Sequence, residues 1–281
     1  ELTSMAGLEN LESIEGNLRI AGTGIHSLNG FNQLERVKGK VEISNNPSLR
    51  FVNGFNTIQT IDHELIITQN PQLESINGFN SLEEIKKGAL IIENSPDLSS
   101  IKGFSSLRKT RGLILSKLGI ENIRFLSGLF ELQPRFDGAI KITGCRLSAL
   151  NGLDKLISTK SSLYLHNNRL ENLCGLESLV EVGASFSLSS NRLTDISQLR
   201  NLTKVNGMLG LAFNRLKTLD GLQNLRFLKT VKWGQQVRTL ILQGNPELKD
   251  ISALANVVES TRNLTAYTDS PTQYTIQPQQ S

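Results

Sequence analysis

The stretch that decides the fold is Leu-Ile-Ile-Thr-Gln-Asn-Pro-Gln-Leu-Glu-Ser-Ile-Asn-Gly-Phe, residues 65–79. Its pattern returns at residues 90–104 as Leu-Ile-Ile-Glu-Asn-Ser-Pro-Asp-Leu-Ser-Ser-Ile-Lys-Gly-Phe. The stretch opens with two apolar residues that are separated by one residue. Such a pair occurs ten times along the chain, and the steps between successive pairs are 23 to 31 residues, most of them 23 to 25. A fixed period of self-similar segments is typical of a solenoid, in which each repeat forms one coil that stacks on the next.

Each repeat has the pattern of a strand followed by two corners. Strand alternation predicts that Leu65 and Ile67 point inward while Ile66 points outward. The Asn-Gly step at residues 53–54 and 77–78 predicts a tight turn, in which we expect the glycine to take a positive φ. The Asn-Pro step at residues 70–71 predicts a second corner. Stacked coils of this kind make a parallel sheet.

A polar column supports this register. Three residues after the second apolar strand residue come Asn46, Asn70, Ser95, Leu118, Cys145, Asn168, Asn191, Asn214 and Asn245. A buried Asn at a corner can satisfy backbone groups of adjacent coils, because its amide offers two donors and an acceptor. Cys145 is thus expected to be a member of this column. Cys174 precedes the turn glycine, at a different corner, so we expect no disulfide.

At these residues the chain resembles leucine-rich repeats. Leu163-Tyr-Leu-His-Asn-Asn168-Arg-Leu170 has their pattern, and Leu73-Glu-Ser-Ile-Asn-Gly-Phe79 followed by Ala89-Leu-Ile-Ile-Glu-Asn-Ser-Pro96 is similar to receptor L-domain repeats, which occur also in bacterial and fungal cell-surface proteins. The resemblance implies a right-handed solenoid, α/β or mainly β, of roughly eleven repeats with 23–25 residues each. It also implies recognition of a ligand or protein, usually at the cell surface or outside the cell.

The period predicts one solenoid over residues 1–255, followed by a C-terminal cap and flexible tail over residues 256–281, where Thr, Ser, Gln and Pro dominate. Aromatic residues make up only 5% of the chain, as suits coils packed with Leu, Ile and Val. The net charge is +4, without the clustered basic residues and interleaved aromatics of a nucleic-acid binder over most of the chain. No run of 18 apolar residues predicts a membrane span.

The sequence contains no pattern that predicts catalysis. His26, His63 and His166 belong to three well-separated coils, and the motifs H-E-x-x-H, C-x-x-C and G-x-S-x-G are missing, as is a phosphate-binding loop. The acidic residues are scattered over loops without a recurrent pair on neighbouring strands. We therefore expect a protein that is not an enzyme and that needs no metal and no cofactor.

The outward residues of the strands form the first predicted partner-binding site. Neighbouring parallel strands lie about 4.8 Å apart, so Ile66, Ile91 and Ile114 should form one apolar stripe. The site continues with Lys141, Tyr164 and His166. An apolar patch with a polar border often marks an interface. The alternative is that these isoleucines only stack as a β-branched ladder, which stabilises any sheet.

The longer loop of the last full coil is the second predicted site. It spans 19 residues from Gly221 to Leu240, against 11 from Gly54 to Leu65. Loops that project from a rigid solenoid often bind partners. The alternative is a solvated loop with the only Trp folded back as a lid. The proposed contact residues are Arg226, Lys229, Lys232, Trp233 and Arg238.

We therefore predict a non-catalytic recognition or adhesion module that binds a protein or glycan and is part of a larger cell-surface or secreted protein. Self-association is a further possibility. The alternative is a cytoplasmic leucine-rich-repeat scaffold subunit, since Asn214-Arg-Leu-Lys-Thr-Leu-Asp-Gly-Leu222 resembles repeats of phosphatase regulators and ciliary proteins. Asn201 and Asn263 fit the pattern for N-glycosylation in a secreted eukaryotic protein.

Overall fold

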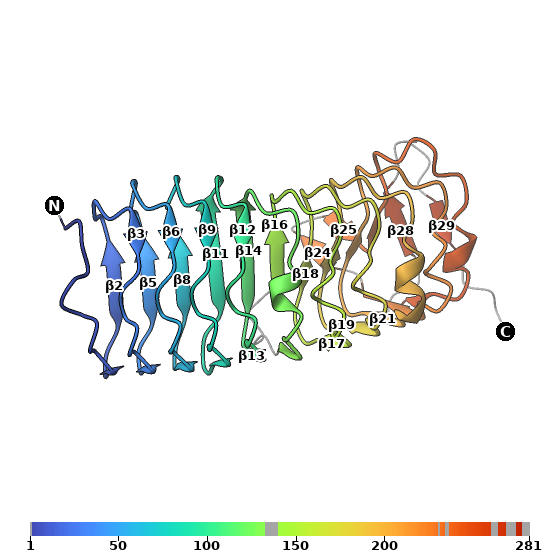
Figure 1. Cartoon of the computed structure of the whole chain (residues 1–281). Coiled ribbons are helices and arrows are strands. Elements are labelled where there is room, and N and C mark those ends of the chain that lie inside the picture. The colour runs from blue at the N-terminus through green and yellow to red at the C-terminus, as the bar shows by residue number, and fades with distance from the viewer. Residues whose placement is uncertain are drawn as a thin grey trace. The chain divides into compact units, whose positions relative to one another are not determined.

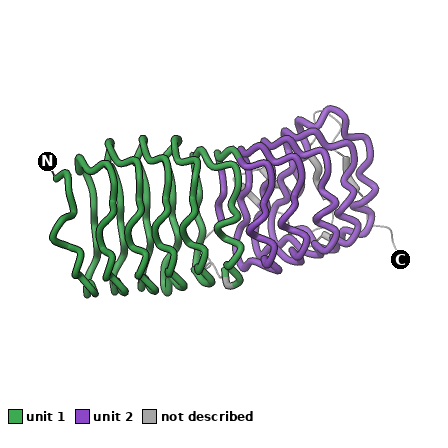
Figure 2. The backbone as a smooth tube through the Cα atoms, viewed as in Figure 1, with its two compact units in different colours: residues 1–135, 144–146 green, residues 136–143, 147–281 purple. Residues whose placement is uncertain are grey.

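The computed structural model describes residues 2–132, 140–229, 231–233, 236–259, 264–267 and 274–276. Of the strand residues 131, 232–233, 236–238, 258–259, 264–267 and 274–276, only the backbone is described. The chain divides into two compact units (Figure 2). Unit 1 comprises residues 1–135 and 144–146, and unit 2 comprises residues 136–143 and 147–281.

Three columns of strands build unit 1 (Figure 1). The main parallel column is β2 (Leu18–Ala21), β5 (Val41–Ser44), β8 (Leu65–Thr68), β11 (Leu90–Ser95) and β14 (Leu113–Leu118). The second column is β1 (Ser13–Ile14), β4 (Arg36–Val37), β7 (Thr60–Ile61), β10 (Glu84–Ile85), β13 (Lys109–Thr110) and β15 (Glu131–Leu132). The third is β3 (Ser27–Leu28), β6 (Phe51–Val52), β9 (Ser75–Ile76) and β12 (Ser100–Ile101). Among the described residues of this unit, one 3₁₀-helix, η1 (Arg124–Leu126), lies between β14 and β15.

Unit 2 continues the same kind of coil with shorter strands. Its main parallel column is β16 (Ile140–Thr143), β18 (Leu163–Tyr164), β20 (Phe186–Ser187), β22 (Leu209–Gly210), β26 (Leu240–Ile241) and β28 (Leu264–Tyr267), to which β29 (Tyr274–Ile276) adds antiparallel. The second column is β17 (Ser158–Thr159), β19 (Glu181–Val182), β21 (Lys204–Val205), β23 (Phe227–Leu228) and β27 (Val258–Glu259). The remaining elements are the hairpin β24 (Val231–Trp233) and β25 (Gln236–Arg238), and the 3₁₀-helices η2 (Ser197–Asn201) and η3 (Ser252–Leu254).

The predicted fold class is confirmed: the chain forms a mainly β, leucine-rich-repeat-like solenoid of parallel strands. Its described residues contain 3₁₀ turns but no α-helix. Leu65 pairs with Leu90, and Leu90 with Leu113, so residues of equal position in the repeat stack directly. The inward residues Leu65 and Ile67 are fully buried, as the alternation predicts. The hydrophobic core therefore runs as columns of equivalent side chains inside the coils.

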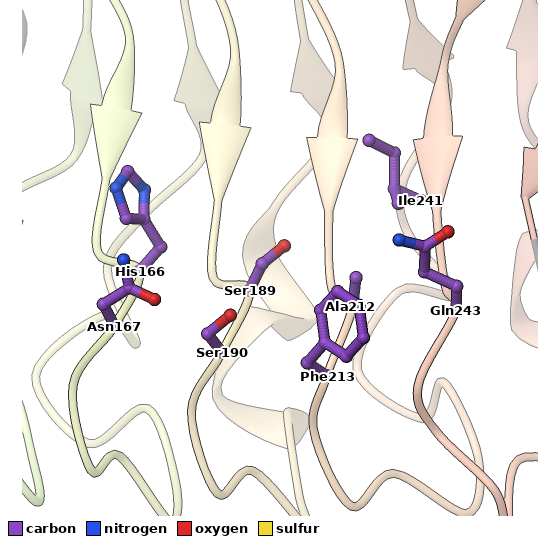
Figure 3. Close-up of a pocket in the computed structure, with 8 residues that line it drawn as sticks. All are labelled: His166, Asn167, Ser189, Ser190, Ala212, Phe213, Ile241 and Gln243. Carbon is purple, nitrogen blue, oxygen red and sulfur yellow. The ribbon is translucent and has the colours of Figure 1, made fainter.

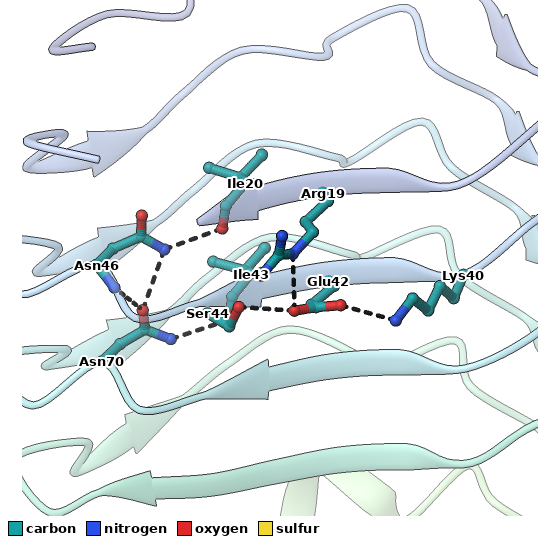
Figure 4. Close-up of polar contacts among 8 residues, drawn as sticks. All are labelled: Arg19, Ile20, Lys40, Glu42, Ile43, Ser44, Asn46 and Asn70. Atoms are coloured by element: carbon teal, nitrogen blue, oxygen red, sulfur yellow. Dashed lines mark hydrogen bonds and ion pairs between the residues drawn. The ribbon is translucent and has the colours of Figure 1, made fainter. Parts of the chain in front are cut away.

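The predicted asparagine column is confirmed as well (Figure 4). Asn46 and Asn70 are fully buried. The Asn46 Nδ2 donates to the Ile20 carbonyl at 3.1 Å, and the Asn70 Nδ2 donates to the Ile43 carbonyl at 3.1 Å. The Asn70 Oδ1 accepts from the Asn46 backbone N–H at 3.0 Å and from the Asn46 Nδ2 at 3.2 Å. Each Asn thus satisfies backbone groups of neighbouring coils that could not reach water.

The turn prediction was wrong about which residue takes the positive φ. In the Asn-Gly-Phe turns it is the phenylalanine that is left-handed, with φ of 65° at Phe55 and 63° at Phe79. The glycines serve close approach instead, because a Cβ on Gly78 would overlap the carbonyl oxygen of Gly54 in the coil before it. This turn directs the aromatic ring into the core. Four fully buried rings stack there in sequence, at centroid distances of 4.7 to 5.4 Å: Phe31, Phe55, Phe79 and Phe104.

Strands β28 and β29 of the C-terminal region lie within the described residues. They pair antiparallel, with Thr265 opposite Thr275. Residues 260–263, 268–273 and 277–281 lie outside the described residues, so the boundary at residue 255 and the tail stay predictions.

Candidate functional site

The strand face of unit 1 carries the predicted isoleucine stripe. Ile66 is the register partner of Ile91, and Ile91 of Ile114, so the three side chains follow one another across β8, β11 and β14. All three are half-buried rather than fully exposed, because outward side chains of adjacent strands cover one another. The stripe therefore exists as a structural feature, while its role in binding stays a prediction.

A charged cluster continues this row at β5 and β2 (Figure 4). Glu42 is the register partner of Ile66 and of Arg19. Its carboxylate accepts hydrogen bonds from the Lys40 Nζ at 2.8 Å, the Ser44 Oγ at 2.8 Å and the Arg19 Nε at 3.1 Å. The bond from Lys40, then that from Ser44, lowers the pKa of Glu42 from 4.5 to about 2. The isoleucine stripe of unit 1 therefore ends at the Glu42 carboxylate, which is ionised and held in place by its hydrogen bonds.

In unit 2, Lys141, Tyr164 and His166 occupy the corresponding outward positions. Lys141 is the register partner of Tyr164, and the rings of Tyr164 and His166 lie 5.9 Å apart at an angle of 59°. Burial, and secondly the charge of Lys141, lowers the pKa of His166 below its usual 6.5. The imidazole is therefore neutral at pH 7, with one nitrogen as donor and the other as acceptor.

The strand face of unit 2 also contains a hollow of about 300 Å³ that we did not predict (Figure 3). Ala212, of which only 3% is exposed, lies at its base. His166 lies at one end, two residues beyond the end of β18. Ile241, on β26, and Gln243, just beyond β26, lie at the other end. Its other lining residues are Asn167, Ser189, Ser190 and Phe213.

The hollow results from the order of side-chain sizes across four neighbouring strands. The outward residues along the register are Tyr164, Ser187, Gly210 and Ile241, so two small residues lie between two large ones. The next outward position repeats the order, with Ser189 and Ala212 between His166 and Gln243. This order was available in the sequence. It becomes a hollow only because parallel pairing sets these residues side by side.

The inserted segment of unit 2 is not an irregular loop. Its backbone forms the antiparallel hairpin of β24 and β25, with Val231 opposite Arg238 and Trp233 opposite Gln236. Arg226 and Lys229, before the hairpin, are exposed, and the Arg226 guanidinium donates to the Gln223 carbonyl at 2.8 Å. The side chains of Lys232, Trp233 and Arg238 lie outside the described residues, so the proposed basic contact and the alternative lid are both left as predictions.

The cysteines occupy the two corners that the sequence indicates. Cys145 is buried, with its Sγ 3.9 Å from the Leu115 carbonyl oxygen, and burial raises the pKa of its thiol to about 11. Cys174 is half-buried. No group of three His, Cys, Asp or Glu side chains in the described part of the chain could hold a metal ion. Asn201, in η2, donates through its Nδ2 to the Glu177 carbonyl at 2.7 Å, and Asn263 lies outside the described residues.

Comparison with known proteins gives one family. Residues 3–110 match the family described as Receptor L domain. No curated protein matches the sequence. Among solved structures, the chain aligns with a protein in the "Crystal structure of TLR13-ssRNA13 complex" at 14% identity and a TM-score of 0.26, over 87% of this chain. The chain spans 58% of that protein's length. None of the helices among the described residues is long and apolar enough to cross a membrane. Over residues 3–110 the chain is similar to Receptor L domains, and its repeats are those of a leucine-rich-repeat-like solenoid.

Proposed function

We propose that the chain is a non-catalytic recognition module that binds a protein or a glycan through its strand face, as part of a larger cell-surface or secreted protein. The observation that carries this proposal is the row of Ile66, Ile91 and Ile114 on three paired strands, which ends at the ionised Glu42. Half-buried apolar side chains beside a fixed charge offer both contact area and orientation to a partner. The match to Receptor L domains over residues 3–110 supports the same function.

A rigid scaffold adds to this argument. The outward residues of unit 1 are held in register by main-chain pairing on both sides and by the buried Asn column beneath one end of the strands. A surface that is already ordered loses little conformational entropy when it binds. The face of unit 1 therefore suits recognition better than an adaptable loop would.

The test is capture of partners by the isolated chain and by two variants of the face. In one variant Ile66, Ile91 and Ile114 are each replaced by Asp, and in the milder one by Thr, which keeps the β-branched shape. The control replaces Ser27, Ser75 and Ser100 by Asp, which adds the same charge on a different strand column of unit 1. All chains are compared by circular dichroism and melting temperature before use.

We expect the native chain and the serine-position control to capture the same partner from source cells and their medium, and both isoleucine variants to lose it. Sedimentation velocity of the same chains tests self-association. If binding and association are the same in all variants, the isoleucines are a structural ladder and the proposal fails. An extracellular partner would support the proposed cell-surface or secreted module, whereas a cytosolic partner would favour the alternative of a cytoplasmic scaffold subunit.

A further inference from the structure

We propose that the hollow on the strand face of unit 2 is a binding subsite for a neutral saccharide, in which the ring of Phe213 stacks on the sugar and uncharged side chains bond its hydroxyl groups. This inference rests on the proposed recognition function and narrows the class of ligand. It concerns residues of unit 2, whereas the test of the proposed function concerns Ile66, Ile91 and Ile114 of unit 1.

The first argument is the unusual placement of Phe213. The side chain is 55% exposed although it is a large aromatic, and its backbone has a left-handed φ of 56°. The left-handed φ belongs to this turn of the repeat, since the equivalent residues of other coils also have it, and none of those is aromatic: Gly22, Asn45, Gln69, Asn94, Lys117, Gly144, Asn167, Ser190 and Gly244. The buried phenylalanines of unit 1 with positive φ lie at a different turn of the repeat, after a glycine, so they are not the equivalents of Phe213. A large aromatic side chain that stays more than half exposed, at a position that other coils fill with glycine or polar residues, points to a binding role.

The ring is also held in place. Gly244 lies beside it in the next coil, and a Cβ at Gly244 would overlap the Phe213 ring. The absence of that Cβ lets the ring pack on the backbone of the next coil, at the edge of the hollow (Figure 3). A fixed, exposed aromatic face is suited to the apolar C–H face of a pyranose ring, because such contact buries apolar surface without a change of rotamer.

The second argument is the polar lining. Within the described part of the chain, the side chains of Asn167, Ser189, Ser190 and Gln243 make no hydrogen bond to the protein, and all four line the hollow. Hydroxyl and amide groups both donate and accept, as sugar hydroxyls do. The Asn residues of the buried column use their amides within the fold instead, as Asn214 does toward the Leu188 carbonyl at 3.1 Å.

The third argument is charge and size. None of the lining residues is acidic, Lys or Arg, and His166 at the end of the hollow is neutral at pH 7. A charged ligand would lose hydration without gaining an opposite charge on the lining. A neutral polar ligand has a smaller desolvation free energy and can replace its hydrogen bonds to water with bonds to the lining. The volume of about 300 Å³ lies at the lower end of small-molecule sites, which are about 300–1,000 Å³, and suits one or two sugar rings. A peptide would more naturally add to a sheet edge than enter a hollow on the face of paired strands.

The test is saturation-transfer NMR and calorimetry with defined probes. The neutral probes are laminaritriose, mannotriose, cellotriose and N,N′,N″-triacetylchitotriose, and the others are trigalacturonic acid and an uncharged, end-blocked tripeptide. Phe213→Ala removes the stacking ring, and Ala212→Leu fills the hollow from its base. Ile157→Ala is the matched control, because this residue of unit 2 is also apolar and 62% exposed but does not line the hollow. Melting temperatures show that each variant is folded.

We expect at least one neutral trisaccharide to bind, with affinity at least about tenfold lower in Phe213→Ala, which corresponds to about 1.4 kcal/mol, and binding lost in Ala212→Leu. The Ile157→Ala variant should bind like the native chain. The inference is overturned if no neutral saccharide binds at millimolar concentration, if the anionic sugar or the tripeptide binds more tightly, or if both hollow variants bind normally. In those cases the test at the isoleucines of unit 1 still decides the proposed function separately.

Discussion

Glu42 shows how a single side chain on the strand face is fixed by its neighbours. Lys40 and Ser44 lie on the same strand segment two residues away on either side, and Arg19 lies on the adjacent strand. Only 15% of the Glu42 side chain is exposed. Its hydrogen bonds favour the ionised form, so the carboxylate keeps its charge in acid solutions that protonate ordinary glutamates.

The lowered pKa of Glu42 predicts an acid dependence of stability. Because the folded pKa is about 2 and the unfolded value 4.5, the stabilisation by Glu42 is fully present above pH 4.5 and lost as the pH falls toward 2. We expect the difference in unfolding free energy between the native chain and Glu42→Gln to be constant above pH 5 and to shrink between pH 4.5 and 2. Urea denaturation over this range measures it, with Glu83→Gln as an exposed control. A pH-independent difference would contradict the assigned network.

The two thiols give a second prediction at this scale. Cys145 is buried with a pKa of about 11, so only about one thiol in a thousand is ionised at pH 8. Cys174 is half-buried. We expect iodoacetamide to label Cys174 in the native chain and Cys145 only after denaturation, as mass spectrometry of tryptic peptides can show. Equal labelling of both residues in the native state would place Cys145 outside the buried column.

At the scale of the repeated elements, the buried Asn column and an exposed one offer a matched comparison. Asn70 is fully buried, and its loss would remove the acceptor of the buried Asn46 backbone N–H and one hydrogen bond to the Ile43 carbonyl. Asn80 also bonds across coils, through its Nδ2 to the Asn56 Oδ1 and the Asn77 carbonyl, but it is exposed and water can replace these bonds. We expect Asn70→Ala to cost about 3 kcal/mol of unfolding free energy and Asn80→Ala less than about 1 kcal/mol. Equal costs would show that burial does not decide the strength of these bonds.

The phenylalanine column predicts a contrast between unit 1 and the hollow of unit 2. Phe79 is fully buried between Phe55 and Phe104, so Phe79→Ala removes two ring contacts and leaves a cavity. We expect a loss of about 4 kcal/mol in chemical denaturation. Phe213→Ala should change stability by less than about 0.5 kcal/mol, because its ring is largely exposed. A large loss for Phe213→Ala would mean that this ring serves the fold.

The repeating elements could be predicted from sequence because their signals are local. Alternation placed Leu65 and Ile67 inside, and a fixed offset from each strand identified Asn46 and Asn70 as a column. The positive φ in the Asn-Gly-Phe turn could not be assigned in this way, since the choice between Gly and Phe depends on how close the adjacent coil approaches. The hollow could not be predicted from the sequence for the same reason. It depends on Ser189 and Ala212 lying beside each other across strands, and not on the character of either residue.

At the scale of the whole molecule, each unit is built by contacts between a coil and its immediate neighbours. In unit 1, β8 and β11 are paired on both sides, whereas β2 pairs with β5 alone among the described strands. In such arrays stability is a sum of repeats and their interfaces, and a terminal repeat has one interface fewer.

Hydrogen exchange measures this difference directly. We expect amides of β8 and β11 to exchange at least about tenfold more slowly than those of β2, because an end coil can open without breaking the interior ones. Peptides covering residues 18–21, 65–68 and 90–95 allow the comparison by mass spectrometry. Uniform exchange across the three strands would indicate that unit 1 opens as one block.

The close approach of Gly54 and Gly78 has a consequence for how such a chain can change over generations. The coils of this region present a Gly and a buried Phe at equivalent positions to the coil before and to the coil after, as Gly54-Phe55 and Gly78-Phe79 do. A duplicated segment such as residues 54–77 would therefore pack against both neighbouring coils through contacts of a kind that the chain already contains. The strand face can in this way become longer or shorter by whole coils, while the outward residues of each coil vary independently.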